Sequence, residues 1–161
     1  MIIRNATPSD YGFLLQAVDT WWADEDAHDQ LDPLFVRQFS DTGFVAEEGG
    51  RVIGFLLGCT CYPDNPEGYI HMVASDPCCR QQGVASALYG AFAARVRQKG
   101  CSKLVIAINP ANHQAICFHL RLGFEHDRRV CDSELDGIPV VSGYAGPGQD
   151  RVVMVKQLDP A

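Results

Sequence analysis

The stretch from Tyr69 to Gly100 constrains the fold more than any other part of the chain, because it joins a strand to the longest helical pattern. Tyr69 to Ser75 is predicted to be extended, and Pro77 then turns the chain. The helix that follows, Gly83 to Lys99, keeps one apolar face, formed by Val84, Leu88, Phe92 and Val96. Gly100 suits the left-handed residue that commonly ends a helix. A strand that leads directly into a long amphipathic helix favours an α/β domain.

Shorter elements of both kinds surround this segment. Strands are predicted at Ile2–Ala6, Phe44–Glu47, Arg51–Gly58, Lys103–Ile108, Phe124–Val130 and Arg151–Lys156. Helices are predicted from a Thr7 N-cap and Pro8 to Trp21, over a segment with Leu31, Leu34, Phe35 and Phe39, and over Asn112–Leu122. The Gly49–Gly50 pair between two strands predicts a hairpin. The order predicts a mixed α/β fold with one central sheet, in a single domain over residues 1–161.

The composition excludes several classes of function. The chain carries 13 Lys and Arg residues against 20 Asp and Glu residues, for a formal net charge of −7. This balance argues against nucleic acid, because that affinity comes from basic side chains that neutralise phosphates. No apolar run reaches the roughly 20 residues needed to span a bilayer, and the N-terminus lacks a signal-peptide pattern. We therefore expect a cytoplasmic protein with no nucleic-acid or membrane partner.

The seven cysteines indicate reduced thiols and no bound metal. Their number is odd, and the adjacent Cys78–Cys79 pair lacks the spacing of a disulfide framework. Cys59 and Cys61 share a strand face, but structural zinc sites usually carry Cys-x-x-Cys pairs, and neither pair here has that spacing. A Cys/His metal-binding module is the less favoured alternative.

The turn before the long helix, Arg80 to Ala85, has the character of an anion site. The first N–H groups of a helix have no partner within the helix, and the helix dipole adds positive potential there. Gly83 and the small Ala85 allow a ligand to come close to the backbone. These properties suit a pyrophosphate. The alternative is an ordinary strand–turn–helix connection with an exposed arginine.

A second motif follows about thirty residues later. Asn112 to Phe124, NHQAICFHLRLGF, resembles the N-x-x-A-x-x-(F/L)-Y-x-x-x-G-F signature of the GNAT superfamily of N-acetyltransferases. Arg80 to Ala85 resembles the R-x-x-G-x-A/G coenzyme A loop of the same superfamily. Both motifs stand in the family's order and at its spacing. The resemblance implies a mostly antiparallel central sheet flanked by helices, and transfer of an acetyl or other acyl group from acetyl-CoA, as co-substrate, to an amine.

The resemblance also implies which residues bind the coenzyme. The backbone of the loop would hold the pyrophosphate, through Arg80, Gln81, Gln82, Gly83, Val84 and Ala85. The pantetheine arm would lie along the strand at Met72, Val73 and Ser75, and Asn112 and Phe118 would contribute from the second motif. A bulge in that strand would aim a backbone N–H at the thioester carbonyl, as a small oxyanion hole.

His119 stands where the family carries a tyrosine, which is often assigned as the acid that protonates the departing thiolate. An imidazole with an ordinary pKa near 6.5 is able to donate that proton. The alternative for His119 is a packing or polar surface residue, with the thiolate protonated by water.

His71 is the second catalytic candidate, as a general base for the amine. Arylalkylamine acetyltransferases of the superfamily carry a histidine at what looks like the matching strand position. Strand alternation predicts that either His71 or Met72 faces the cleft, with the other on the opposite side. A satisfied core histidine is an equal alternative, and Glu67 and Tyr69 are weaker candidates for the base.

The acceptor side is less defined. Trp21 and Trp22, followed by acidic residues that include Asp26, would suit a cationic amine on a small molecule or peptide. A solvated acidic loop beside a core tryptophan is the alternative. The Gly- and Pro-rich segment 132–150 predicts either a hairpin over the acceptor site, with Tyr144 near its tip, or a homodimer contact. For the function of the whole chain, the alternative to an acetyltransferase is a sensor that binds acyl-CoA without catalysis.

Overall fold

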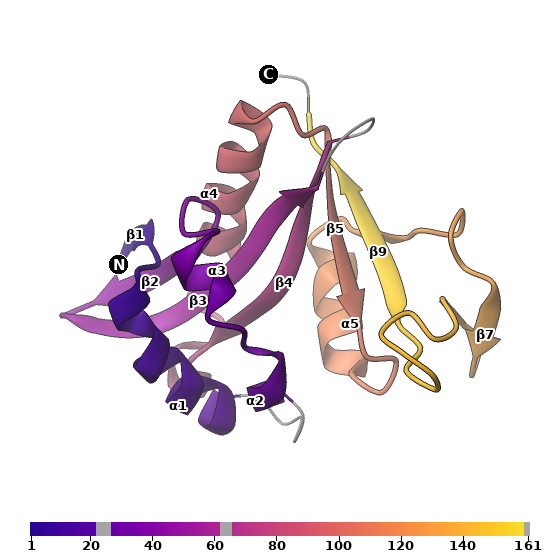
Figure 1. The fold of residues 1–161 in the computed structure, drawn as a ribbon, viewed down its shortest axis with the longest axis horizontal. Helices are drawn as coiled ribbons and strands as arrows, with labels where there is room; N and C mark the ends of the chain where they lie inside the picture. The colour runs from indigo at the N-terminus through magenta and orange to yellow at the C-terminus, as the bar shows by residue number, and fades with distance from the viewer. Residues whose placement is uncertain (22–26, 62–65, 160–161) are drawn as a thin grey trace. The chain divides into compact units, whose positions relative to one another are not determined.

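The computed structural model describes residues 1–21, 27–61 and 66–159, which form helices and strands in two compact units (Figure 1). The first unit covers Met1–Cys101 and the second Ser102–Ala161. In each unit antiparallel strands are flanked by helix. The predicted mixed α/β class with mostly antiparallel strands is confirmed.

The sheet of the first unit has the order β1-β2-β3-β4, with every neighbouring pair antiparallel. Its strands are β1 (Ile2–Asn5), β2 (Phe44–Glu48), β3 (Arg51–Cys61) and β4 (Glu67–Ser75). Gly49 and Gly50 join β2 to β3 with φ angles of 58° and 78°. A two-residue hairpin turn matches the twist of its strands when both of its residues have positive φ angles. The hairpin predicted at this glycine pair is confirmed.

Short helices cover one face of this sheet, and one long helix covers the other (Figure 1). The first face carries the 3₁₀ turn Pro8–Asp10, α1 (Tyr11–Trp21), α2 (Ala27–Gln30) and α3 (Leu34–Arg37), and the second carries α4 (Val84–Gln98). The helix expected to carry Leu31 and Phe39 is therefore shorter than predicted. Pro33 disfavours the helical conformation of the residue before it, which separates α2 from α3.

Two glycines of β3 allow α4 to pack closely on the sheet. A Cβ atom added at Gly54 would lie 2.6 Å from Cγ1 of Val84, and one at Gly58 would lie 2.7 Å from Cε2 of Phe92. Between them, Phe55 and Leu57 point to the opposite face, where they join the core under α1 and α3. Successive residues of β3 therefore face in turn the side covered by α4 and the side covered by α1 and α3.

The second unit contains a smaller sheet and a helix. Its elements are β5 (Lys103–Ile108), α5 (His113–Arg121), β6 (Glu125–His126), β7 (Ser133–Leu135), β8 (Ile138–Val140) and β9 (Val152–Gln157). β9 pairs antiparallel with both β5 and β6. The strand predicted over Phe124–Val130 is only two residues long, because the Asp127 carboxylate accepts hydrogen bonds from the backbone and side chain of Arg129 and bends the chain.

An ion pair fixes the start of α1 to the sheet. The guanidinium of Arg4 on β1 donates two hydrogen bonds to the Asp10 carboxylate, at 2.8 and 2.9 Å, and a third to Glu47. Asp10 is buried and also accepts the Thr7 backbone N–H at 2.8 Å. The hydrogen bonds from Arg4 lower the pKa of Asp10 from 3.8 to about 2.

We expect Asp10→Asn to lower the free energy of unfolding by about 2 kcal/mol at pH 7, the equivalent of that pKa difference. Because the pKa is lower in the folded state, the contribution is complete above the unfolded value and is lost as pH falls toward 2. Urea unfolding at pH 7 and at about pH 3 measures both effects. Asp41→Asn is the control, since its surface pair with Lys99 should contribute less than about 1 kcal/mol. Equal losses in the two variants would refute the role of Asp10.

Candidate functional site

The loop before α4, where the sequence predicts an anion site, contains two residues with a left-handed backbone conformation. A 3₁₀ turn, Pro77–Cys79, is followed by Arg80 to Gly83, and Gly83 is the N-cap of α4 with a φ of 80°. A Cβ at Gly83 would have no heavy atom within 4 Å, so the space beside this backbone is open. Gln81 also has a positive φ, 62°, which is unusual for a residue with a side chain and costs about 1–2 kcal/mol. Left-handed residues near a helix start are typical of loops whose N–H groups converge on an anion.

Asp76 fixes the entry to this loop. Its carboxylate accepts the Cys78 backbone N–H at 2.8 Å and pairs with the Arg51 guanidinium at 3.2 Å. Its own N–H donates to the carbonyl of Ile53 on β3, at 2.9 Å. Sequence reasoning missed this contact, although an Asp before Pro at the end of a strand is a turn signal.

β4 carries a bulge at His71. Met72 pairs with Leu57 and Ile70 pairs with Gly58, so β4 has one residue more than β3 at this point. Ile70 lies opposite a glycine that faces α4, whereas Met72 belongs to the core cluster under α1 and α3. His71 contacts the α2–α3 segment too, so His71 and Met72 lie on the same face of the sheet. The prediction that His71 and Met72 lie on opposite faces of the sheet is wrong, because the bulge interrupts the alternation of side chains.

The imidazole of His71 is held on two sides. Nε2 lies 2.7 Å from the carbonyl oxygen of Gln30, and the ring stacks on Phe35 with 4.2 Å between centroids and 5° between planes. Burial lowers the pKa of His71, although the Gln30 carbonyl and the charge of Asp32 oppose this effect. The ring is therefore mostly neutral at pH 7, as a general base must be.

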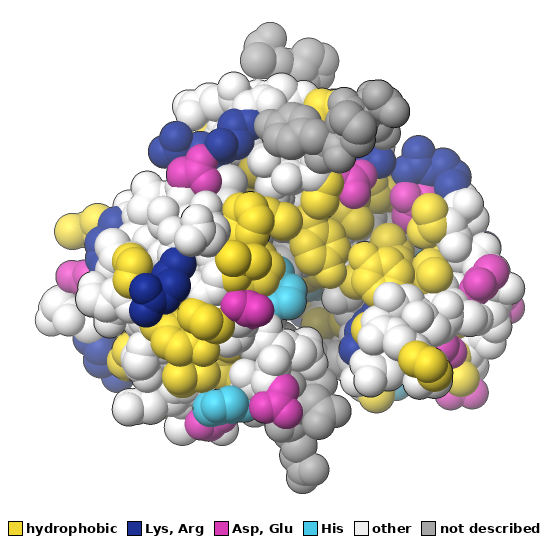
Figure 2. Space-filling model, in the orientation of Figure 1, with side chains coloured by type: hydrophobic (Ala, Val, Ile, Leu, Met, Phe, Trp, Pro, Cys, Tyr) yellow, Lys and Arg dark blue, Asp and Glu magenta, His cyan; other side chains and the backbone are white. Residues whose placement is uncertain are grey.

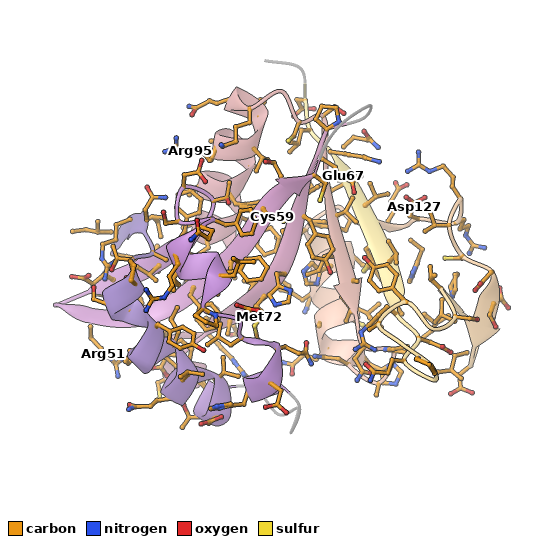
Figure 3. The ribbon with its side chains drawn as sticks, in the orientation of Figure 1. Arg51, Cys59, Glu67, Met72, Arg95 and Asp127 are labelled. Carbon is orange, nitrogen blue, oxygen red and sulfur yellow. The ribbon has the colours of Figure 1, made fainter. Side chains whose placement is uncertain are left out.

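The other strand residues expected at the coenzyme occupy different environments. The Met72 side chain, labelled in Figure 3, is 1% exposed and belongs to the core. Only the backbone of Met72 is therefore available to a ligand. On β4, Met72, Val73 and Ser75 pair with Leu57, Leu56 and Gly54 of β3. Glu67 and Tyr69 precede His71 at alternate positions, so strand geometry places all three on one face.

In the second unit the family motif forms α5. Asn112 is the N-cap, and its side-chain oxygen accepts the Ala115 N–H at 3.0 Å. The predicted coenzyme residue therefore has a structural role at the helix start. Phe118 is half-buried, and its ring meets the imidazole of His119 edge-on at 5.3 Å.

His119 is 2% exposed, so the polar surface alternative for this residue is wrong. Its ring also meets Phe124 edge-on, and Nδ1 lies 2.7 Å from the Ala115 carbonyl oxygen. A carbonyl only accepts, so Nδ1 carries the proton of the neutral ring and Nε2 carries the lone pair. Burial lowers the pKa of His119, and the Ala115 hydrogen bond opposes this effect. Proton donation from Nε2 therefore requires the imidazolium form.

The predicted acceptor residues are only partly described. Trp21 packs on the core, with its ring stacked on Phe55 at 6.3 Å and edge-on to Phe13 at 5.8 Å. Trp22 and Asp26 lie outside the described residues. Segment 132–150 forms the short β7–β8 hairpin, turned at Asp136–Gly137, and then a loop on which Tyr144 is exposed.

The cysteines are thiols, and none of them is in a disulfide. Burial and the nearby Cys61 raise the pKa of Cys59 to about 12, which keeps this thiol protonated. Within residues 1–21, 27–61 and 66–159, no group of three or more Cys, His, Asp or Glu side chains is arranged to hold a metal.

No helix in the described part of the chain has the length and apolar character needed to cross a bilayer. Basic and acidic side chains are interspersed on the face shown in Figure 2.

Comparison with known proteins gives concordant matches. Residues 10–124 match the model of the acetyltransferase (GNAT) family. N-alpha-acetyltransferase 30 of Schizosaccharomyces pombe is 32% identical over 108 residues, which cover 64% of this chain and 70% of that protein. L-2,4-diaminobutyric acid acetyltransferase of Nocardia farcinica is 34% identical over 84 residues, 52% of this chain but only 43% of that protein. The crystal structure of Ard1 from Thermoplasma volcanium has the same fold, with a TM-score of 0.74 at 22% identity, covering 98% of this chain and 97% of that one.

Proposed function

The chain belongs to the acetyltransferase (GNAT) family, and from this membership we propose that it transfers the acetyl group of acetyl-CoA to a primary amine on a small molecule or peptide. The observation that carries the proposal is the loop before α4. Gly83 takes a left-handed φ in open space, and the helix directs its first N–H groups toward the same region. This arrangement suits the pyrophosphate of CoA and needs little positive charge.

We propose direct transfer with His71 as general base. The amine nitrogen forms a bond to the thioester carbon, the C–S bond breaks, and CoA departs as a thiolate. The proton of the amine passes to His71. A neutral imidazole at the β4 bulge, with its pKa lowered by burial, supports this role. His119 then supplies the proton that the departing thiolate takes up.

The class of acceptor is proposed from the relatives, whose names refer to N-alpha-acetylation and to diaminobutyric acid. A panel of N-terminal peptides and small diamines, each incubated with acetyl-CoA, tests the proposal. Release of CoA thiol together with an acetylated product is the expected result. CoA binding without transfer to any amine would instead support the acyl-CoA sensor.

His119→Ala is expected to lower the transfer rate by about tenfold or more at mildly acidic pH, within the range of general acid catalysis. Because burial lowers the pKa of His119, its acid form is populated only at mildly acidic pH. The ratio of wild-type to variant rate should therefore shrink as pH rises. Thiol release followed from about pH 5.5 to 8.5 measures this ratio, and CoA affinity should change little.

His119→Tyr restores the family residue and is expected to recover part of the rate. Thermal unfolding of both variants shows whether loss of a buried side chain has destabilised the second unit. Full activity of His119→Ala at every pH would assign His119 to packing between Phe118 and Phe124, with water as the proton donor.

A further inference from the structure

We propose that Phe35 and the Gln30 carbonyl are positioning groups that hold His71 with Nδ1 as its proton-accepting atom. This inference rests on the proposed function, because it assigns the reacting atom of the base. It extends the site to two short helices, α2 with Gln30 and α3 with Phe35.

The hydrogen bond to Gln30 determines the tautomer. A carbonyl oxygen only accepts, so the 2.7 Å contact places a hydrogen on Nε2 of His71 and the lone pair of the neutral ring on Nδ1. When Nδ1 takes up a proton, the Nε2–H···O bond persists and becomes charge-assisted. The same contact therefore orients the base before proton transfer and stabilises its cation afterwards.

The stack on Phe35 fixes the rotation of the ring. A single hydrogen bond at one nitrogen does not fix the plane of the imidazole, because the torsion of histidine about its Cβ–Cγ bond is broad. Two rings 4.2 Å apart and nearly parallel remove that freedom and give the Nδ1 edge a single direction. Phe35 is itself supported by Phe39, at 5.7 Å, and by the core cluster.

The backbone that accepts the hydrogen bond is also restrained. The Tyr11 hydroxyl of α1 donates to the carbonyl of Leu31, the residue after Gln30, at 3.1 Å. Leu31 is buried in the core cluster. The Gln30 carbonyl is thus held in position, and it orients His71 as an acidic side chain orients the histidine in many catalytic pairs.

Imidazole NMR of the full chain, labelled with ¹⁵N-histidine and without ligand, tests the positioning. His71→Gln identifies the signals. We expect an Nε2–H that exchanges slowly with water and an unprotonated Nδ1. Phe35→Leu should make that hydrogen exchange faster, and Phe35→Tyr should preserve its protection because the stack is kept. Phe13→Leu is the matched control, since Phe13 is an exposed phenylalanine of α1 whose ring contacts Trp21.

Kinetics with the identified amine test the catalytic part. Phe35→Leu should lower kcat by about tenfold or more with the KM for acetyl-CoA unchanged, because a base that has lost its orientation is often out of reach. Phe35→Tyr should restore kcat. A proton on Nδ1, or wild-type protection in Phe35→Leu, would overturn the positioning. A third outcome is slow exchange of the Nε2 hydrogen in the wild type together with full activity of His71→Gln. It would overturn the assignment of Nδ1 as the base, independently of whether the chain is an acetyltransferase.

Discussion

Replacing His71 with glutamine is expected to lower the acetyl-transfer rate by about 10²–10⁴-fold, the range of general base catalysis. A glutamine amide is able to donate to the Gln30 carbonyl as Nε2 does, so the α2 contact is kept while the basic nitrogen is lost. His71→Ala removes both and should also reduce stability. Thiol release at saturating acetyl-CoA measures the loss, and the KM for acetyl-CoA should stay unchanged.

The pH profile provides a second test of His71. Because burial lowers the pKa of His71, the acid limb of the wild-type profile should rise through a value below 6.5, and the contribution of His119 is lost at higher pH. His71→Gln should lack this rise. His28→Gln is the control, because His28 is exposed and pairs with Asp19 on the surface. A variant that keeps both the rate and the rise would move the base to Glu67 or Tyr69, which share the face of β4.

Gly83→Val is expected to weaken CoA binding by tenfold or more. A left-handed conformation costs an ordinary residue about 1–2 kcal/mol, and a β-branched residue more, so the loop would leave the geometry that directs N–H groups toward the ligand. Each 1.4 kcal/mol corresponds to a tenfold change in affinity. Titration of the protein with CoA, followed by calorimetry, measures the effect.

Gly90→Val is the matched control for this prediction. Gly90 lies in the middle of α4, also in open space, and its φ is not positive. The same substitution there should leave CoA affinity unchanged. Gly83→Asn should lose less affinity than Gly83→Val, since asparagine tolerates the left-handed region. Wild-type affinity in Gly83→Val would show that the pyrophosphate binds elsewhere.

Much of the fold was predictable because its signals are local. The apolar face of α4, the glycines at its two ends and the Gly49–Gly50 turn depend on residues a few positions apart, and all appear where the sequence predicted them. The family, predicted from two motifs in order, is confirmed by the match over residues 10–124. Asn112 lies at the start of α5 as expected, with its side-chain oxygen engaged as the helix cap.

Features that depend on a distant partner were not predictable. The position of the bulge is set by the pairing of β4 with β3, so single-strand alternation placed His71 and Met72 on opposite faces when they share one. The ion pair between Arg51 and Asp76 joins the start of β3 to the turn after β4, and no local sequence pattern indicates it. For Trp21 the sequence left an acceptor residue and a core tryptophan open, because whether an aromatic side chain packs inward depends on the whole core.

The bulge in β4 separates the residue proposed for chemistry from the residues that build the core. Without His71, Ile70 and Met72 would become neighbours opposite Gly58 and Leu57, and each would keep the face it already occupies. The strand would then be regular, with an unbroken alternation from Gly68 to Ser75. His71 is therefore equivalent to a one-residue insertion into a complete strand. A substitution at this position therefore leaves the pairing partners and the faces of Ile70 and Met72 unchanged.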